Sequence, residues 1–275
     1  MPLIAALLMI ASGSVHAIVN AIVKGGRDKM AGRALTDGSS AIIVLPAILL
    51  VPLPAGAWAW IGASAVIHGF YLWALVRAYQ VGDLSAAYPV MRGTAPLLTA
   101  LVTLGLLGEP ASPQQMAGIA LVGSAMFVMI WGRHLAREGL GWAIATGVCI
   151  AGYTIVDAHG VRAAPSSVSY IVWLFLVMGC VVVTMFGIAT RGAVFAAAVR
   201  QWRPGVVAGA LSIITYGMAL RAFALGPTAP LAALRETGMV TALLISVIVL
   251  KERATRGRIT AVLGILAGAA IILTG

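Results

Sequence analysis

Three charged residues stand inside stretches of sequence that are otherwise apolar enough to cross a membrane. Arg92 lies in an apolar run over 84–106, and Arg235 and Glu236 are neighbours in a second run over 229–250. A charge at membrane depth costs about 3 kcal/mol on insertion scales, so such residues usually serve a function. An arginine can bind a carboxylate there, and a glutamate can bind an amine or a coupling proton. The alternative is an internal ion-pair network that only holds the helices together.

Other polar side chains recur at helical spacing within the apolar runs and form stripes. Such stripes should face a shared wet interior, because lipid penalises them. The candidate substrate-binding residues are the three charged residues together with His16, Asn20, His68, Tyr71, Tyr88, Tyr153, Asp157 and Tyr216. Structural alternatives stand beside each of them: the histidines can be satisfied within the fold, and Asp157, close to His159, can lie at a solvated helix end.

Prolines flank the buried charges in both runs. Proline removes a backbone hydrogen-bond donor and loosens a helix locally. The candidate gating hinges are therefore Pro89, Pro96, Pro227 and Pro230. Ordinary kinking is the alternative, because proline is frequent in membrane helices.

The composition is that of a protein which spans a membrane many times. Of its 275 residues, 61% are hydrophobic and 9% are charged, and the mean hydropathy is +1.03. A soluble domain would be about a quarter charged. The net charge of +10 is scattered over short connections and forms no patch, so we expect contact with the lipid bilayer and no binding of nucleic acid.

Windows of about 20 apolar residues predict ten membrane-spanning helices and an all-α fold. The expected spans are 3–23, 34–51, 57–79, 84–106, 114–131, 140–159, 166–189, 204–224, 229–250 and 258–274. Spans 5 and 10 have almost no polar side chains and are expected on the outside of the bundle.

The two halves of the chain resemble each other. When Arg77 is laid on Arg221 and one deletion is allowed, Arg92 falls on Arg235. Each half holds five spans, an odd number, so the second half enters the membrane in the opposite sense to the first. We therefore predict two inverted five-helix repeats, 1–137 and 138–275, an arrangement common in secondary transporters.

Basic residues in the connections predict the orientation. The connections after even-numbered spans hold essentially only Arg162, whereas those after spans 1, 5, 7 and 9 hold Lys24, Arg27, Lys29, Arg33, Arg133, Arg137, Arg191, Arg200, Arg203, Lys251, Arg253, Arg256 and Arg258. By the positive-inside rule, the basic connections would be cytoplasmic and both termini outside. The first run lacks a positive n-region and is interpreted as a retained span. We expect a multi-pass protein of the bacterial inner membrane.

No enzyme or cofactor signature is present. The sequence has no H-E-x-x-H, no P-loop, no G-x-S-x-G with partner residues and no Rossmann glycine run. Cys149 and Cys180 lie in apolar runs without C-x-x-C spacing, which indicates neither a disulfide framework nor a metal site. We expect no enzyme activity, no cofactor and no metal. The sequence does not define the oligomeric state and is compatible with a monomer.

Two longer motifs resemble those of a known family. The first half reads R-A-x-x-x-G-D-L-S-x-A-Y-P-V-x-R-x-x-A-P-L, and the second reads L-R-E-x-x-x-V-x-A-L-L-I-S-x-x-x-L-x-E-R. With ten short spans in two repeats, the chain resembles EamA-type transporters of the drug/metabolite transporter superfamily. The resemblance implies a central cavity between spans 1–4 and 6–9, alternating access, and export of amino acids, aromatic ones among them, or of other small metabolites.

We therefore expect a secondary transporter that exports small metabolites, with amino acids as the favoured class. Some members of the family carry phosphorylated sugars, but this chain has one arginine per half and no Lys/Arg cluster in its spans, which disfavours a multiply charged phosphate. Two alternatives remain open at this stage. One is a multidrug or lipid-carrier flippase with an acidic cation site, and the other is a membrane scaffold that transports nothing.

Overall fold

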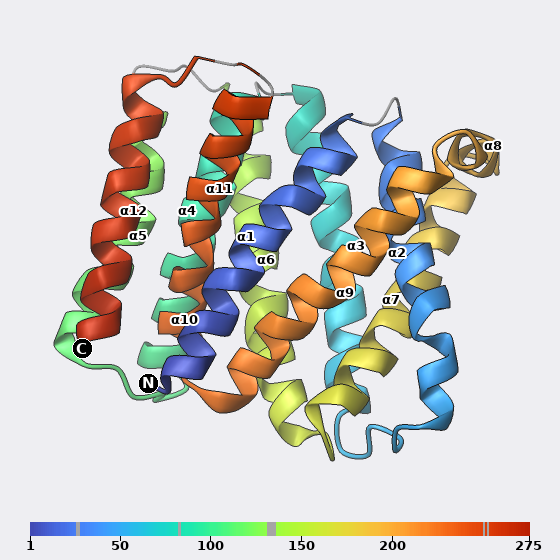
Figure 1. Cartoon of the computed structure of the whole chain (residues 1–275), viewed down its shortest axis with the longest axis horizontal. Coiled ribbons are helices and arrows are strands. Elements are labelled where there is room, and N and C mark those ends of the chain that lie inside the picture. Colours follow the sequence, from blue (N-terminus) through green and yellow to red (C-terminus); the bar gives the residue numbers. More distant parts are fainter. Residues whose placement is uncertain (26–27, 82–83, 131–135, 250, 252) are drawn as a thin grey trace.

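A computed structural model of the chain describes residues 1–25, 28–81, 84–130, 136–249, 251 and 253–275, and over these residues the regular secondary structure is entirely helical. The long helices run up and down beside one another (Figure 1). In chain order the helices are α1 (Leu3–Gly25), α2 (Lys29–Val44), η1 (Leu45–Leu49), α3 (Trp58–Val81), α4 (Leu84–Gly105), α5 (Pro113–Val128), α6 (Arg137–Ala163), α7 (Ser167–Ala189), α8 (Ala193–Val199), α9 (Trp202–Leu225), α10 (Thr228–Leu234), η2 (Arg235–Thr237), α11 (Gly238–Leu244), η3 (Ile245–Val249) and α12 (Arg256–Thr274).

Eight helical segments within the described residues are long and apolar enough to cross a membrane. They correspond to eight of the ten expected spans. The other two expected spans are helices as well, but α5 has only 16 residues and α4 carries Arg92, and neither meets both criteria. That α4 and α5 also cross the membrane stays a prediction.

The helices pack in a consistent set of pairs. α1 packs against α9, α3 against α6, and α2 against α7. α4 packs against α6, while α1 also packs against η2 and α11. α5 and α12 form a pair at one edge of the bundle, opposite α2 and α7 (Figure 1).

Glycines allow helices α5 and α12 to approach each other closely. A Cβ added to Gly118 of α5 would lie 2.7 Å from the carbonyl oxygen of Gly268 in α12, and one added to Gly268 would lie 2.8 Å from that of Gly118. The two backbones are therefore nearly in contact, as in other small-residue helix pairs. α5 begins at the capping box that Ser112 and Gln115 form.

The segment over 228–249 is a broken helix. α10 ends at Leu234, the next three residues form the 3₁₀ turn η2, and α11 begins at Gly238, with the π-helical turn η3 after it. A mid-helix 3₁₀ stretch often marks a functional site. α1 packs directly on this break at Gly13, where a Cβ would collide with the carbonyl oxygen of Arg235.

Both termini lie at one end of the bundle, and the ends of α1, α3, α5, α7 and α11 lie at the other (Figure 1). A chain that crosses the membrane an even number of times has both termini on the same side, in agreement with this position of the termini. One element was not expected: the short helix α8 lies in the connection between α7 and α9.

Candidate functional site

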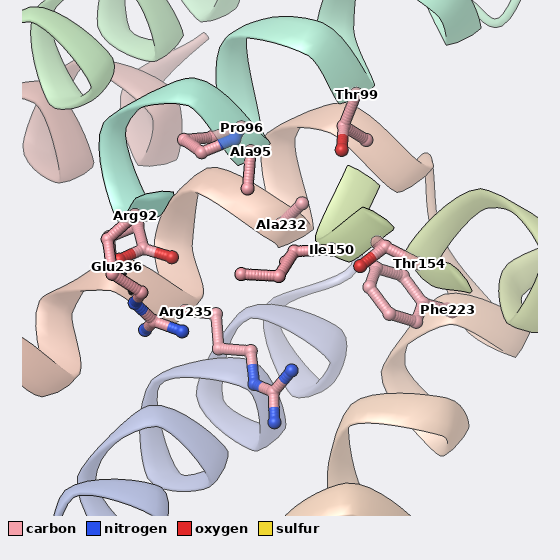
Figure 2. Close-up of a pocket in the computed structure, with 10 residues that line it drawn as sticks. All are labelled: Arg92, Ala95, Pro96, Thr99, Ile150, Thr154, Phe223, Ala232, Arg235 and Glu236. Atoms are coloured by element: carbon pink, nitrogen blue, oxygen red, sulfur yellow. Dashed lines mark ion pairs between the residues drawn. The ribbon is translucent and has the colours of Figure 1, made fainter. Parts of the chain in front are cut away.

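A small cavity lies between α4, α6, α9 and the broken helix (Figure 2). It leaves about 20 Å³ open to the centre of a water molecule, which is room for about one water. Its lining combines three charged side chains with mostly apolar ones: Arg92, Ala95, Pro96, Thr99, Ile150, Thr154, Phe223, Ala232, Arg235 and Glu236. The charged residues singled out in the sequence therefore share one cavity.

Arg92 and Glu236 form a buried ion pair across the two halves of the chain. Nε of Arg92, on α4, lies 2.9 Å from Oε2 of Glu236, on η2. The exposed fractions of the two side chains are 10% and 5%. The two atoms are close enough for an ion pair, although they are not aligned as a hydrogen-bond donor and acceptor. Burial makes this pair costly to break, because removing either residue leaves the charge of the other buried and uncompensated.

Arg235 differs from Arg92 in that no carboxylate of the described residues lies within ion-pair distance of it. Its Nε atom is buried and has no hydrogen-bond partner among the described residues, none of whose carboxylates pairs with it. The guanidinium instead lies over the ring of Tyr216, with Cζ 5.3 Å from the ring centroid. Figure 2 shows it extending away from the ion pair. An unpaired guanidinium beside a cavity is suited to binding an anionic group of a ligand.

Asp157 forms a second polar centre next to the first. It is fully buried on α6, and its carboxylate accepts hydrogen bonds from the hydroxyls of Tyr216 on α9 and Tyr170 on α7, the latter at 2.8 Å. The alternative of a solvated helix end is therefore wrong for Asp157. Because Arg235 lies over the ring of Tyr216, this tyrosine touches both centres.

Aromatic rings surround this second centre. His68 stacks on Tyr153 with 4.1 Å between ring centroids, and Tyr71 meets Tyr153 edge to face at 5.8 Å. Nδ1 of His68 lies 2.9 Å from the carbonyl oxygen of Ser64, one turn earlier in α3. The structure thus brings together five of the predicted residues: His68, Tyr71, Tyr153, Asp157 and Tyr216.

Three predicted site residues belong neither to the cavity lining nor to the aromatic group around Asp157. His16 and Asn20 lie on α1 and Tyr88 on α4, and all three are half-buried. They neighbour the site through their helices, since α1 packs on η2 and α11.

The candidate hinges occupy different places in their helices. Pro89 and Pro96 lie inside α4, and Pro96 lines the cavity. Pro227 caps the start of α10, and Pro230 lies in its first turn, where a missing backbone donor costs little. The break in this segment falls instead at Arg235–Thr237.

Sequence reasoning missed several residues of the two centres. Thr154, Ile150 and Phe223 line the cavity, and Tyr170 binds Asp157. The first three carry no distinguishing signal in an apolar run, whereas Tyr170 follows three serines at the start of its span and could have been noticed. Among the described residues, no three His, Cys, Asp or Glu side chains cluster as metal ligands would.

The helices and the buried charges define a polytopic membrane protein with a polar site inside its bundle. Residues 137–274 match the EamA-like transporter family. The chain belongs to this family, which is one of transporters.

A solved structure shares the fold of this chain, although no curated sequence does so recognisably. No curated protein matches the sequence. A crystal structure described only as that of a protein is similar, with a TM-score of 0.70 over 98% of this chain and 98% of the other. The two sequences are 19% identical, so the likeness concerns the fold alone.

Proposed function

We propose that this protein is a secondary transporter of the bacterial inner membrane that exports small metabolites, amino acids in particular, aromatic ones included. The observation that carries the proposal is Arg235, a buried arginine that lies at the edge of a cavity and forms no ion pair with any carboxylate of the described residues. The arginine would bind the carboxylate of the substrate. Glu236, already next to Arg92, would accept hydrogen bonds from the ammonium group.

The transport mechanism that we propose is alternating access. The cavity holds about one water molecule, whereas a site for a small organic ligand measures roughly 300 Å³ or more. A substrate can therefore enter or leave only after the helices around the cavity move apart. The break at η2, next to the charged residues, is a place where such movement can occur, as in the discontinuous helices of other transporters.

Helix packing supports two inverted repeats of five spans, 1–137 and 138–275. Let α6, α7, α9, the segment α10–η2–α11 and α12 correspond to α1, α2, α3, α4 and α5. The contact of α3 with α6 then corresponds to that of α9 with α1, and the contact of α4 with α6 to that of α11 with α1. In the pairs α2–α7 and α5–α12, the two helices that pack together are each other's equivalents in the two halves. This twofold pattern is what ten spans in two inverted repeats require.

Asp157 is the group that we propose for the coupling proton. A buried carboxylate costs several kcal/mol unless a cation compensates it, and the carboxylate of Asp157 accepts hydrogen bonds from neutral phenols, those of Tyr170 and Tyr216. Glu236 is less suited to this role, because Arg92 already holds its charge. Tyr216 connects Asp157 to the proposed carboxylate site at Arg235.

The same acidic centre favours a second candidate, the export of organic cations. Asp157 lies among His68, Tyr71, Tyr153 and Tyr216, and aromatic faces attract cations. A drug or lipid carrier with a cationic group would bind there rather than at Arg235.

A flux assay in proteoliposomes tests these proposals. Purified protein would be tested with a panel of radiolabelled amino acids, other carboxylates and organic cations, with and without a pH gradient. Saturable flux of an amino acid that depends on Arg235 supports the first proposal. Flux of cations alone, dependent on Asp157, would favour the second. If no compound of the panel is transported, the result would favour the alternative of a membrane scaffold that transports nothing.

A further inference from the structure

The short connection between α4 and α5 is bound tightly to the second half of the chain. Glu109 is the residue that binds it. Its Oε1 atom lies 2.7 Å from Nη1 of Arg162, and its Oε2 atom accepts a hydrogen bond of 2.6 Å from the backbone N–H of Thr228. The hydroxyl of Thr228 donates to Oε1 at 2.8 Å. Three donors from the second half thus converge on one carboxylate from the first.

Arg162 extends this network to a further helix. From the last turn of α6, its Nε atom donates to the carbonyl oxygen of Phe223 at 2.9 Å, and its Nη2 atom donates to that of Gly226 at 2.7 Å. Both acceptors lie at the C-terminal end of α9, where unpaired carbonyls attract a cation. Four elements are therefore joined at one point: the connection after α4, α6, α9 and α10.

This point lies next to the cavity. Phe223, whose carbonyl accepts from Arg162, also lines the cavity with its side chain. Thr228 begins α10, one turn before the cavity residue Ala232. The ends of α4 and α6 that carry the network lie at the same end of the bundle as the two termini (Figure 1).

We propose that Glu109, Arg162 and Thr228 form a gate latch that closes the cavity toward the face of the membrane where the termini lie. The inference rests on the proposed transport function. Opening toward that face requires the latch to separate, because it holds the first half's α4–α5 connection against α6, α9 and α10 of the second half. Closing the latch again isolates the cavity.

The latch has the properties of a contact that can open and close. The side chains of Arg162 and Glu109 are 31% and 12% exposed, so water can replace their mutual contacts when they separate. Separating a partly exposed ion pair costs far less than separating a buried one. The pair of Arg92 and Glu236, which is more deeply buried, is less suited to repeated opening.

The charge state of Glu109 keeps the latch closed near neutral pH. Burial alone raises the pKa of the Glu109 carboxyl, but hydrogen bonds from Arg162 and Thr228 outweigh this effect and lower the pKa below its ordinary value. The carboxylate is therefore ionised throughout the neutral range and accepts all three hydrogen bonds.

Thiol labelling of the cavity tests the latch without requiring transport. Cys149→Ala and Cys180→Ala remove the native thiols, and Ala232→Cys places one in the cavity lining. A membrane-impermeant maleimide is then applied to right-side-out and to inside-out vesicles. We expect Glu109→Gln to speed labelling about tenfold from the face of the termini, as loss of a charge-assisted contact implies, and not from the other face.

The chain offers a matched control for this experiment. Arg33 and Asp37 form an ion pair with the same N–O distance of 2.7 Å and exposed fractions of 31% and 10%, but within the single helix α2. Asp37→Asn should leave the labelling rate at Ala232→Cys unchanged. An unchanged rate with Glu109→Gln, or an equal rise from both faces, would overturn the proposal.

Two further variants guard against misfolding and separate this proposal from the transport function. If Glu109→Gln does not give a monodisperse protein, Thr228→Val removes the contacts of the Thr228 hydroxyl with Glu109 and Arg162 and should still speed labelling about threefold. In the cysteine-free background, Glu109→Cys with Thr228→Cys, joined by a short reducible crosslinker, should stop substrate flux, and reduction should restore it. Flux at the uncrosslinked rate would contradict the latch. If the unmodified protein carries no substrate, the transport proposal fails, but the labelling result still decides the latch.

Discussion

Replacing Arg92 and Arg235 separately should give opposite outcomes, although the two arginines occupy corresponding positions in the halves of the sequence. Nε of Arg92 lies 2.9 Å from Oε2 of Glu236. At that separation, with an effective dielectric constant of about 20, the attraction is about 6 kcal/mol, part of which offsets desolvation. Removing one partner of a buried pair costs about 3–5 kcal/mol, because the other charge stays uncompensated. We therefore expect Arg92→Gln to lower the free energy of unfolding by about that amount.

Arg235→Gln should leave stability nearly unchanged and remove substrate affinity. The substitution loses the contact of the guanidinium with the ring of Tyr216, worth about 0.5–2 kcal/mol. It also removes a buried charge that no carboxylate of the described residues pairs with, which offsets that loss. A charge-assisted hydrogen bond to a substrate carboxylate is worth about 1.5–3 kcal/mol. The Kd of the substrate should therefore rise about 10- to 150-fold.

Thermal unfolding in detergent and calorimetric titration with the transported substrate measure both effects. The double variant Arg92→Gln with Glu236→Gln is the control, because it removes both charges and should recover much of the stability that either single variant loses. If Arg235→Gln destabilises the protein as much as Arg92→Gln does, or if Arg92→Gln leaves stability unchanged, the distinction between a structural and a substrate-binding arginine is wrong.

Three other predictions concern coupling, the latch and the broken helix. Asp157→Asn should abolish flux driven by a pH gradient while substrate exchange without a gradient continues; gradient-driven flux in this variant would rule out Asp157 as the proton site. Because the pKa of Glu109 lies below its ordinary value of 4.5, the labelling rate of Ala232→Cys, divided by that of a free thiol at the same pH to correct for the thiolate fraction, should stay low as pH falls to that value and rise only at more acid pH, and a rise already near pH 6 would contradict this sign. Gly13→Ala should displace η2 and lower stability by about 1–3 kcal/mol, whereas Gly141→Ala, with open space at its Cβ position, should cost little; equal Tm values for the two variants would disprove the close approach.

Much of the fold could be predicted from sequence because lipid imposes a simple rule. Each apolar run of sufficient length predicts a helix, and helices do occur at all ten predicted positions. The capping box at Ser112, where α5 begins, is likewise a local pattern that can be recognised in the sequence. The outer position of α5 and α12 followed from their lack of polar side chains. These features depend on composition or on a few neighbouring residues.

The site could be predicted only in part, because its contacts join helices that are distant in sequence. Arg235 and Glu236 are adjacent, but neighbours on a helix do not face each other, and Glu236 pairs with Arg92 on α4 instead. The partners of Asp157 come from α7 and α9. No local pattern encodes the break at η2, which lies in close contact with α1 at Gly13.

The latch shows the same limit. The sequence favours a capping or topological role for Glu109, which lies at a helix end. The carboxylate does bind the first backbone N–H of a helix, but that helix is α10, in the other half of the chain. The contacts of Glu109 with the second half can therefore be recognised only when the relative position of the two halves is known.

The most direct test of the proposed substrate site is competition with analogues that lack one charge. In proteoliposomes that exchange a transported amino acid, the free amino acid and its methyl ester are compared as competitors for the unmodified protein and for Arg235→Gln. Carboxylate binding by Arg235 predicts that the ester competes at least about tenfold more weakly with the unmodified protein, and that this difference disappears in the variant. Equal competition by the ester and the free amino acid in the unmodified protein would contradict the assignment of Arg235.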